Sequence, residues 1–324
     1  MAAPDPYTHT VNPVMGCLNG CWYCYARGMV TRFAGRCKAC QQFYPHPHDG
    51  HARLAKLPKK PVAKGKRPRL IFIGSACDLW SDAVLPTWRL AIWQHVHRMH
   101  GRADGAPCGD FAAVCTKRPD RIDVGEITGA FRTEWKDGED GLTPQPPLLD
   151  TLAPCGSSGL PGEGENGRVW PRALWVGTTI TGDEHRPGQA REERRFEDLR
   201  RAVPAERAYL SIEPLLGPGA AQILADELAV GRRPAWVMLG PLTGQHEDLK
   251  GWHDRTRDAA ENTIEMCKAW GVPIWVKEAA RDAWPGIEMR QERPECLNGT
   301  SPPAPLHRME RGDGNCEGGD SDAV

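Results

Sequence analysis

Short apolar runs alternate with longer amphipathic segments along most of the chain. The apolar runs are typical of strands and the longer segments are typical of helices. The predicted strands cover residues 8–14, 70–73, 111–115, 174–178, 208–212, 235–239 and 273–276. The predicted helices cover residues 86–100, 189–202, 219–229 and 255–270. Strands that alternate with helices in this way predict βα units and a parallel sheet.

Seven such strands indicate an α/β protein with a partial, open βα barrel of the TIM-like type, which carries its chemistry at the carboxyl ends of the strands. We expect this barrel to span residues 1–284, with a Cys/His-containing and basic insertion at 35–68. Residues 136–168 are rich in Gly, Pro and acidic residues and lack periodicity, so they predict a disordered insertion. The composition of residues 285–324 likewise predicts a disordered tail.

The amino-acid composition excludes few classes of protein. The chain has 324 residues, of which 40% are hydrophobic, enough for one large domain or two small ones. The formal net charge of −1 gives no bulk electrostatic indication of a nucleic-acid partner. No apolar run approaches the length of a membrane span, and no signal peptide is evident, so we expect a cytoplasmic protein without a membrane partner. Twelve cysteines then indicate reduced thiols and metal chemistry.

The most specific motif is the spacing C-x3-C-x2-C formed by Cys17, Cys21 and Cys24, directly after the first predicted strand. Three thiolates on a short loop can ligate three irons of a [4Fe–4S] cluster, which normally takes four cysteines. The fourth iron then stays open for a small molecule. A zinc knuckle is the alternative, because Cys37 and Cys40 follow closely. Structural zinc sites favour paired C-x2-C hooks, however, and three residues separate Cys17 from Cys21.

The longer run N-P-x-x-G-C-x-x-G-C-x-Y-C-Y-A-R, residues 12–27, resembles the cluster motif of the radical S-adenosylmethionine (SAM) superfamily, in the branch of spore photoproduct lyase-like proteins. Segments at 71–80, 116–119, 211–218 and 271–277 resemble an uncharacterised, phage-associated family allied to that branch. The resemblance implies a [4Fe–4S] cluster whose open iron binds SAM. It also implies reductive cleavage of SAM to a 5′-deoxyadenosyl radical.

The same resemblance and the carboxyl-end rule select further residues. Tyr23 is the aromatic beside the third cysteine, and the resemblance places its backbone at the adenine of SAM; packing over the cluster is the alternative. Ser75 and Asp78 stand where most radical SAM enzymes have a G-G-E-type motif, and both could accept hydrogen bonds from the SAM ammonium group. A loop or helix-capping carboxylate is the alternative for Asp78. Lys117 follows the third predicted strand, and the resemblance implies that it pairs with the SAM carboxylate; an ordinary solvated lysine is the alternative.

Three more residues follow or end predicted strands. Thr178 is a candidate contact for the SAM ribose. Glu213 is a candidate contact for SAM or substrate, with a buried structural salt bridge as the alternative. Cys77 could donate a hydrogen atom to a substrate radical, although a cysteine in such a place is more often a small buried hydrophobe.

A second group of metal-ligand residues lies in the 35–68 insertion. Cys37 and Cys40 form a C-x2-C hook, and His46 and His48 follow, which is zinc-ligand spacing. A second iron–sulfur cluster and the absence of any metal remain open alternatives. The basic residues between 53 and 69 could follow a phosphate backbone, or could form a solvated linker.

We therefore expect a radical SAM enzyme that receives electrons from a donor such as a flavodoxin or ferredoxin. Its expected substrate is a nucleotide or nucleic-acid base, to be modified or repaired. Two alternatives remain: a non-catalytic zinc or iron–sulfur binding module, and a radical SAM enzyme acting on a peptide or small metabolite.

Overall fold

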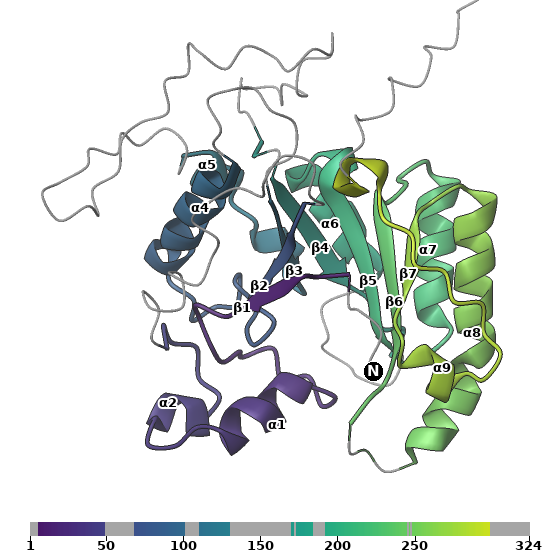
Figure 1. Cartoon of the computed structure of the whole chain (residues 1–324), viewed down its shortest axis with the longest axis horizontal. Helices are drawn as coiled ribbons and strands as arrows, with labels where there is room; N and C mark the ends of the chain where they lie inside the picture. Colours follow the sequence, from purple (N-terminus) through teal and green to yellow (C-terminus); the bar gives the residue numbers. More distant parts are fainter. Residues whose placement is uncertain are drawn as a thin grey trace, which may run out of the picture.

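A single parallel sheet organises the protein. The computed structural model describes residues 6–48, 68–100, 110–129, 170–171, 173–183, 192–244, 246 and 248–298. Seven strands lie in chain order, so each strand pairs with the next (Figure 1). Their bounds are β1 His9–Val11, β2 Leu70–Ile73, β3 Phe111–Thr116, β4 Leu174–Thr179, β5 Ala208–Leu215, β6 Trp236–Pro241 and β7 Ile274–Val276. The sheet curls into a half-barrel, which confirms the predicted fold class.

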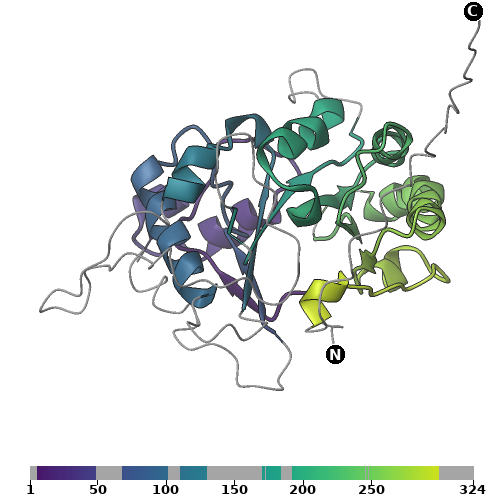
Figure 2. The same ribbon diagram turned by 90° about the horizontal axis from the view of Figure 1, so that it is seen from above.

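Helices cover the outer face of the curled sheet (Figure 2). The longer ones are α4 Pro86–His100, α6 Glu192–Ala202, α7 Gly219–Ala229 and α8 Leu249–Ala269. The shorter helices in the described ranges are α1 Tyr25–Arg32, α2 Lys38–Gln41, α5 Val124–Gly129 and α9 Ala280–Ala283, of which α1 and α2 lie beyond one end of the sheet (Figure 1). No helix in these ranges combines the length and the apolar character needed to cross a membrane.

Successive strand residues point to opposite faces, and each face has its own core. Outward side chains such as Ile71, Val176 and Leu210 pack beneath the helices in the largest hydrophobic cluster. Inward side chains fill the hollow of the half-barrel with aromatic rings, among them Phe111, Trp175, Tyr209, Trp236 and Trp275. The hollow is therefore packed near the amino ends of the strands, which leaves the carboxyl edge for a site.

The predicted elements differ from the structure mainly at their ends. β1 stops at Val11 instead of residue 14, because Pro13 has no N–H for the ladder and the Asn12 side chain bonds the backbone of Ala76. α8 begins at Leu249 instead of residue 255, because the Asp248 carboxylate caps it by accepting the Gly251 N–H at 3.1 Å.

Residues 285–298, predicted as the start of a disordered tail, pack against the sheet. The Trp236 indole N–H donates to the Glu292 carbonyl at 2.9 Å, and Arg293 reaches the Pro6 carbonyl. Leu297 is only 2% exposed and joins the aromatic cluster inside the half-barrel. These two hydrogen bonds and the buried Leu297 side chain explain why the segment packs against the sheet. Residues 299–324, the predicted insertion at 136–168 and the basic residues 49–67 lie outside the described residues.

Candidate functional site

The predicted site residues gather at the carboxyl edge of the sheet. The cysteine loop, residues 12–24, connects β1 to α1, and the loop with Ser75 and Asp78 follows β2. Lys117 follows β3 directly, and Glu213 lies near the end of β5. Because all seven strands are parallel, these segments share one edge of the half-barrel.

The cysteine loop presents three free, half-buried thiols, Cys17, Cys21 and Cys24. The Asn19 N–H donates to the Cys17 sulfur at 3.4 Å. Burial, with help from the nearby Asp78 carboxylate, raises the pKa of Cys17 to about 11. Gly16 has a φ of +90°, and a Cβ there would lie 2.3 Å from the Tyr44 carbonyl oxygen. The loop therefore needs glycine at this position to lie flat against the following segment.

Asp78 joins three loops at this edge. Its Oδ1 accepts from the Thr116 hydroxyl at 2.7 Å and from the Trp80 N–H at 3.0 Å. Its Oδ2 accepts from the Asn19 amide at 2.7 Å and from the Lys117 N–H at 2.8 Å. The Asp78 side chain is buried, and all four of its hydrogen-bond donors are groups of this chain. Asp78 thus positions the cysteine loop and Lys117, while its predicted contact with SAM stays a prediction.

Ser75 is held by the end of β1. Its hydroxyl and the Asn12 side chain lie 3.1 to 3.2 Å apart and exchange hydrogen bonds. Its carbonyl accepts the Tyr25 hydroxyl at 3.0 Å, so the first residue of α1 is tied to the loop after β2. Ser75 is half-buried at the edge where the resemblance predicts the methionyl end of SAM.

Lys117 lies above Tyr23, with its Nζ 5.2 Å from the centre of the ring. Burial lowers the pKa of Lys117, but the neighbouring Tyr23 hydroxyl and Cys21 thiol more than offset this, and the ammonium stays charged at neutral pH. Tyr23 is 7% exposed, and burial raises its pKa. Its hydroxyl oxygen is buried without a well-formed hydrogen bond to any described residue. A buried polar atom beside a charged lysine suits a polar ligand.

Glu213 forms an ion pair with Lys277, the residue after β7, with Oε2 2.7 Å from Nζ. Both side chains are partly exposed, at 33% and 23%. Glu213 thus has the partner that a structural salt bridge requires, although this pair is partly exposed to solvent. Thr178 is fully buried, and its hydroxyl donates to the Thr116 carbonyl at 2.9 Å within the sheet. Its predicted contact with ribose is untested.

Cys77 lies half-buried between the cysteine loop and the main core. Burial and the neighbouring Cys17 and Asp78 raise its pKa well above the usual value. The thiol is therefore protonated at neutral pH, the state that a hydrogen donor requires and that a buried hydrophobe also adopts.

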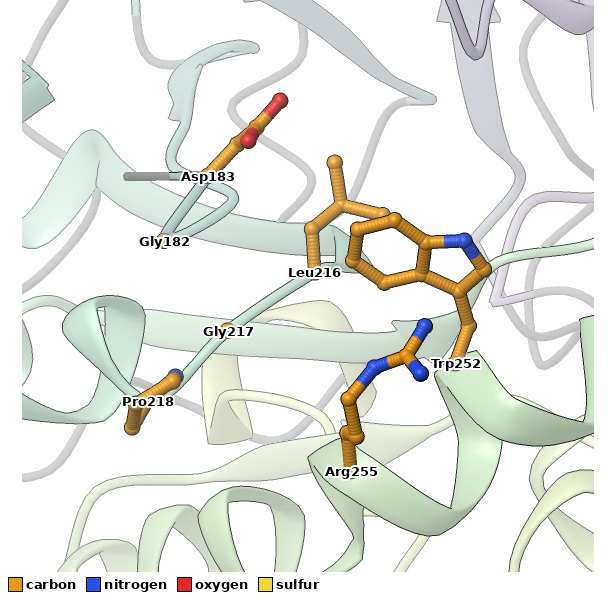
Figure 3. Close-up of a pocket in the computed structure, with 7 residues that line it drawn as sticks. All are labelled: Gly182, Asp183, Leu216, Gly217, Pro218, Trp252 and Arg255. Carbon is orange, nitrogen blue, oxygen red and sulfur yellow. The ribbon is translucent and has the colours of Figure 1, made fainter. Parts of the chain in front are cut away.

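A pocket of about 340 Å³ lies between the segments that follow β4 and β5 and the first turns of α8 (Figure 3). It is lined by Gly182, Asp183, Leu216, Gly217, Pro218, Trp252 and Arg255. Arg255 lies over the Trp252 indole, 4.7 Å from its centre. The pocket meets the cysteine loop through Trp22, whose N–H donates to Asp183 at 2.9 Å and whose ring lies 5.5 Å from that of Trp252.

The second predicted metal group also comes together. The ligand atoms of Cys37, Cys40, His46 and His48 all lie within 4.8 Å of one another. Among the described residues, it is the one group of three or more Cys, His, Asp or Glu side chains whose ligand atoms lie close enough to hold a single ion. In this group Cys37 and Cys40 are joined by two histidines and by none of the three cysteines of the loop.

Several residues of this edge escaped the sequence-based prediction. Lys277 follows a strand directly, so the rule that selected Lys117 would have found it. Asn12 stands in the N-P-x-x-G segment, but nothing local indicates that its amide clamps Ser75. Trp252 and Arg255 carry no motif, and only the tertiary structure brings them to the pocket.

The fold and this edge define an α/β protein with a partial TIM-like barrel and a cysteine loop at the carboxyl ends of its strands. The chain matches, over residues 6–295, the family described as "Protein of unknown function (DUF5131)", and it belongs to that family. No functionally curated protein matches it.

A solved structure titled "Spore photoproduct lyase complexed with dinucleoside spore photoproduct" is similar to the chain, with a TM-score of 0.48 and 11% sequence identity. The match covers 81% of this chain and 74% of that one.

Proposed function

We propose that the protein is a radical SAM enzyme. The observation that carries the proposal is the set of three free thiols, Cys17, Cys21 and Cys24, on one loop at the carboxyl edge of a half-barrel. These residues would hold a [4Fe–4S] cluster and leave one iron for SAM. Their donor chemistry suits the cluster, because iron–sulfur clusters take cysteine thiolates and this loop supplies three of them.

The chemistry available at such a cluster, once bound, is one-electron reduction of SAM to methionine and a 5′-deoxyadenosyl radical. The protein residues supply binding and orientation. Lys117 carries the positive charge that the SAM carboxylate needs, and the buried hydroxyl of Tyr23 lies beside it. Asp78 holds both the cysteine loop and the Lys117 backbone, so it acts as a positioning residue.

The edge also offers the access for an electron donor and the exclusion of water that the reaction requires. Leu18 of the cysteine loop and Tyr25 at the start of α1 are 49% and 60% exposed, so a flavodoxin- or ferredoxin-like donor can approach the loop. The packed aromatic cluster beneath, with Trp175 and Tyr209 fully buried, closes the half-barrel to solvent from the amino side. Exclusion of water protects a carbon radical from side reactions.

We propose a nucleotide or nucleic-acid base as the substrate class. The support comes from the pocket, in which the Trp252 indole and the Arg255 guanidinium lie together (Figure 3). Unpaired bases bind by stacking on aromatic rings and on arginine planes. The contact between Trp22 and Asp183 joins the pocket to the residue that follows Cys21, so a substrate bound there would lie near the cysteine loop.

The test is anaerobic purification and reconstitution, followed by reduction with dithionite in the presence of SAM. We expect iron and sulfide to bind and 5′-deoxyadenosine to form. Cys21→Ala should abolish both, whereas the matched variant Cys316→Ser, at a cysteine with no other Cys or His within eight residues in the sequence, should retain them. An intact SAM pool with a fully loaded cluster would contradict the proposal.

A non-catalytic metal-binding module is the second candidate, favoured by the convergence of Cys37, Cys40, His46 and His48. It predicts bound zinc, no iron–sulfur absorbance and no turnover of SAM. If 5′-deoxyadenosine forms but oligonucleotides neither bind nor increase its yield, a peptide or small metabolite becomes the better substrate class.

A further inference from the structure

The geometry points to a structural zinc site formed by Cys37, Cys40, His46 and His48, which braces the cysteine loop. The His46 Nε2 lies 3.4 Å from each of the two sulfurs, and the His48 Nδ1 lies 3.4 Å from the Cys40 sulfur. The two ring nitrogens lie 3.2 Å apart. The four ligand atoms thus surround one point.

These separations fit tetrahedral zinc. Bonds of about 2.3 Å to sulfur and about 2.0 Å to nitrogen place a sulfur and a nitrogen ligand about 3.5 Å apart, and two nitrogens about 3.3 Å apart. A set of two thiolates and two imidazoles also suits zinc chemically. A two-iron cluster would spread its sulfur and nitrogen ligands over two metal ions, whereas here the His46 nitrogen contacts both sulfurs equally.

The surrounding protein prepares the ligands. The His46 Nδ1 lies 2.8 Å from the Tyr44 carbonyl, to which it donates its proton. The lone pair of the imidazole is then on Nε2, the atom that faces the sulfurs, and metal-binding histidines commonly have such a partner. Cys40 is 2% exposed and packs with Val30 and Ala34 of the small core under α1. Four ligands fill the tetrahedron, which is typical of a structural site.

The site is attached to the cysteine loop by backbone hydrogen bonds. Met15 and His46 exchange N–H to carbonyl bonds, both at 3.0 Å, as an isolated antiparallel bridge. The Cys17 N–H donates to the Phe43 carbonyl at 3.1 Å. A metal ion that holds His46 next to α2 therefore also holds the backbone on which Cys17 lies. Phe43, at a φ of +53°, adopts the strained left-handed conformation between the two pairs of ligands.

The first experiment measures the zinc and iron contents of the full-length protein separately by elemental mass spectrometry. We expect one zinc per chain in the wild-type protein and in Cys21→Ala. We expect less than a tenth of that in Cys37→Ser and in His48→Ala, and full retention in the matched variant Cys77→Ser. Zinc that disappears with Cys21 but stays without Cys37, or a wild-type protein that binds no added zinc, would overturn the inference.

Cobalt gives a second readout that needs no variant. Replacement of zinc by Co²⁺ in the wild-type protein should produce the intense visible absorption of a tetrahedral ion with thiolate ligands, and an octahedral spectrum would rule the site out. These results do not depend on the iron cluster, so the zinc site and the proposed function can fail separately.

The bracing role has its own measurement, hydrogen exchange of the wild-type protein before and after removal of zinc by a chelator. We expect the amides of Met15 and Cys17 to exchange at least tenfold faster without zinc, while the Val237 amide in β6 keeps its rate. Unchanged protection of Met15 and Cys17 in zinc-free protein would show that the ion does not brace the loop.

Discussion

The Asp78 carboxylate accepts a hydrogen bond from the Asn19 side chain at 2.7 Å, and this bond ties the loop after β2 to the loop that carries the three cysteines. The same carboxylate accepts from Thr116 and from the Lys117 backbone. Asp78 is therefore the centre of the arrangement that sets the cysteines beside Lys117.

Replacing Asp78 should cost stability out of proportion to its single charge. Asp78→Ala leaves several buried donors without a partner, so we expect the free energy of unfolding to fall by about 3 kcal/mol. Urea unfolding measures it. Asp82→Ala is the matched control, because this carboxylate is 59% exposed and its ion pairs with arginines lie at the surface. An exposed pair contributes less than about 1 kcal/mol. Equal losses in the two variants would contradict a special role for Asp78.

Gly177 is required by the ring that packs against it. A Cβ on this residue of β4 would lie 2.1 Å from the ring of Tyr209, which is fully buried. We expect Gly177→Ala to destabilise the fold by about 3 kcal/mol, since rigid neighbours on the sheet cannot retreat. Gly28→Ala in α1 is the control. It has open space around it and should stabilise its helix by up to about 1 kcal/mol. Thermal unfolding of both variants distinguishes the cases.

Cys267 should make stability depend on pH in alkaline solution. Burial in α8, with a contribution from Glu292, raises the pKa of its thiol from 9.0 to about 12. The folded state then holds the proton more tightly than the unfolded state, so the stabilisation is complete below pH 9 and is lost as the pH rises toward 12. Between pH 8 and pH 10 the wild type should lose about 1 kcal/mol more than Cys267→Ala.

Urea titrations of the two proteins at both pH values measure this difference. A thiol reagent at pH 8 gives an independent check, because Cys267 should react only when the protein unfolds. Rapid labelling of Cys267 in the native protein would contradict the burial argument.

Arg255 should matter for nucleic-acid binding if the pocket takes a base. Its guanidinium lies over the Trp252 ring, so Arg255→Ala removes one wall of a stacking site. We expect about tenfold weaker binding of a mixed-sequence single-stranded oligonucleotide, in line with about 1–3 kcal/mol per stacked base. Arg257→Ala on the same helix is the control, since Arg257 pairs with Glu261 as Arg255 pairs with Asp248, but Arg257 does not line the pocket. Fluorescence anisotropy measures both, and equal losses would indicate charge alone.

Much of the fold was predictable because its signals are local. Each strand is a short apolar run, as in residues 70–73, and each long helix is an amphipathic stretch, so neighbouring residues already contain the pattern. The helices α1 and α2 were missed because eight and four residues are too few for a clear period. The segment 285–298 was misjudged because its composition is polar, whereas its order depends on a few anchors such as Leu297.

The sequence by itself determined which side chains lie at the carboxyl edge, because the residues that follow parallel strands all lie at the same edge of the sheet. It also predicted the two groups proposed as ligands, Cys17, Cys21 and Cys24 in one loop and Cys37, Cys40, His46 and His48 in the next. Only the tertiary structure decided how these residues connect. Asp78 and Asn19 are 59 residues apart in the sequence, and Trp22 and Asp183 are 161 residues apart, yet each pair is hydrogen-bonded. Such contacts depend on the register and curl of the whole sheet, which no local pattern encodes.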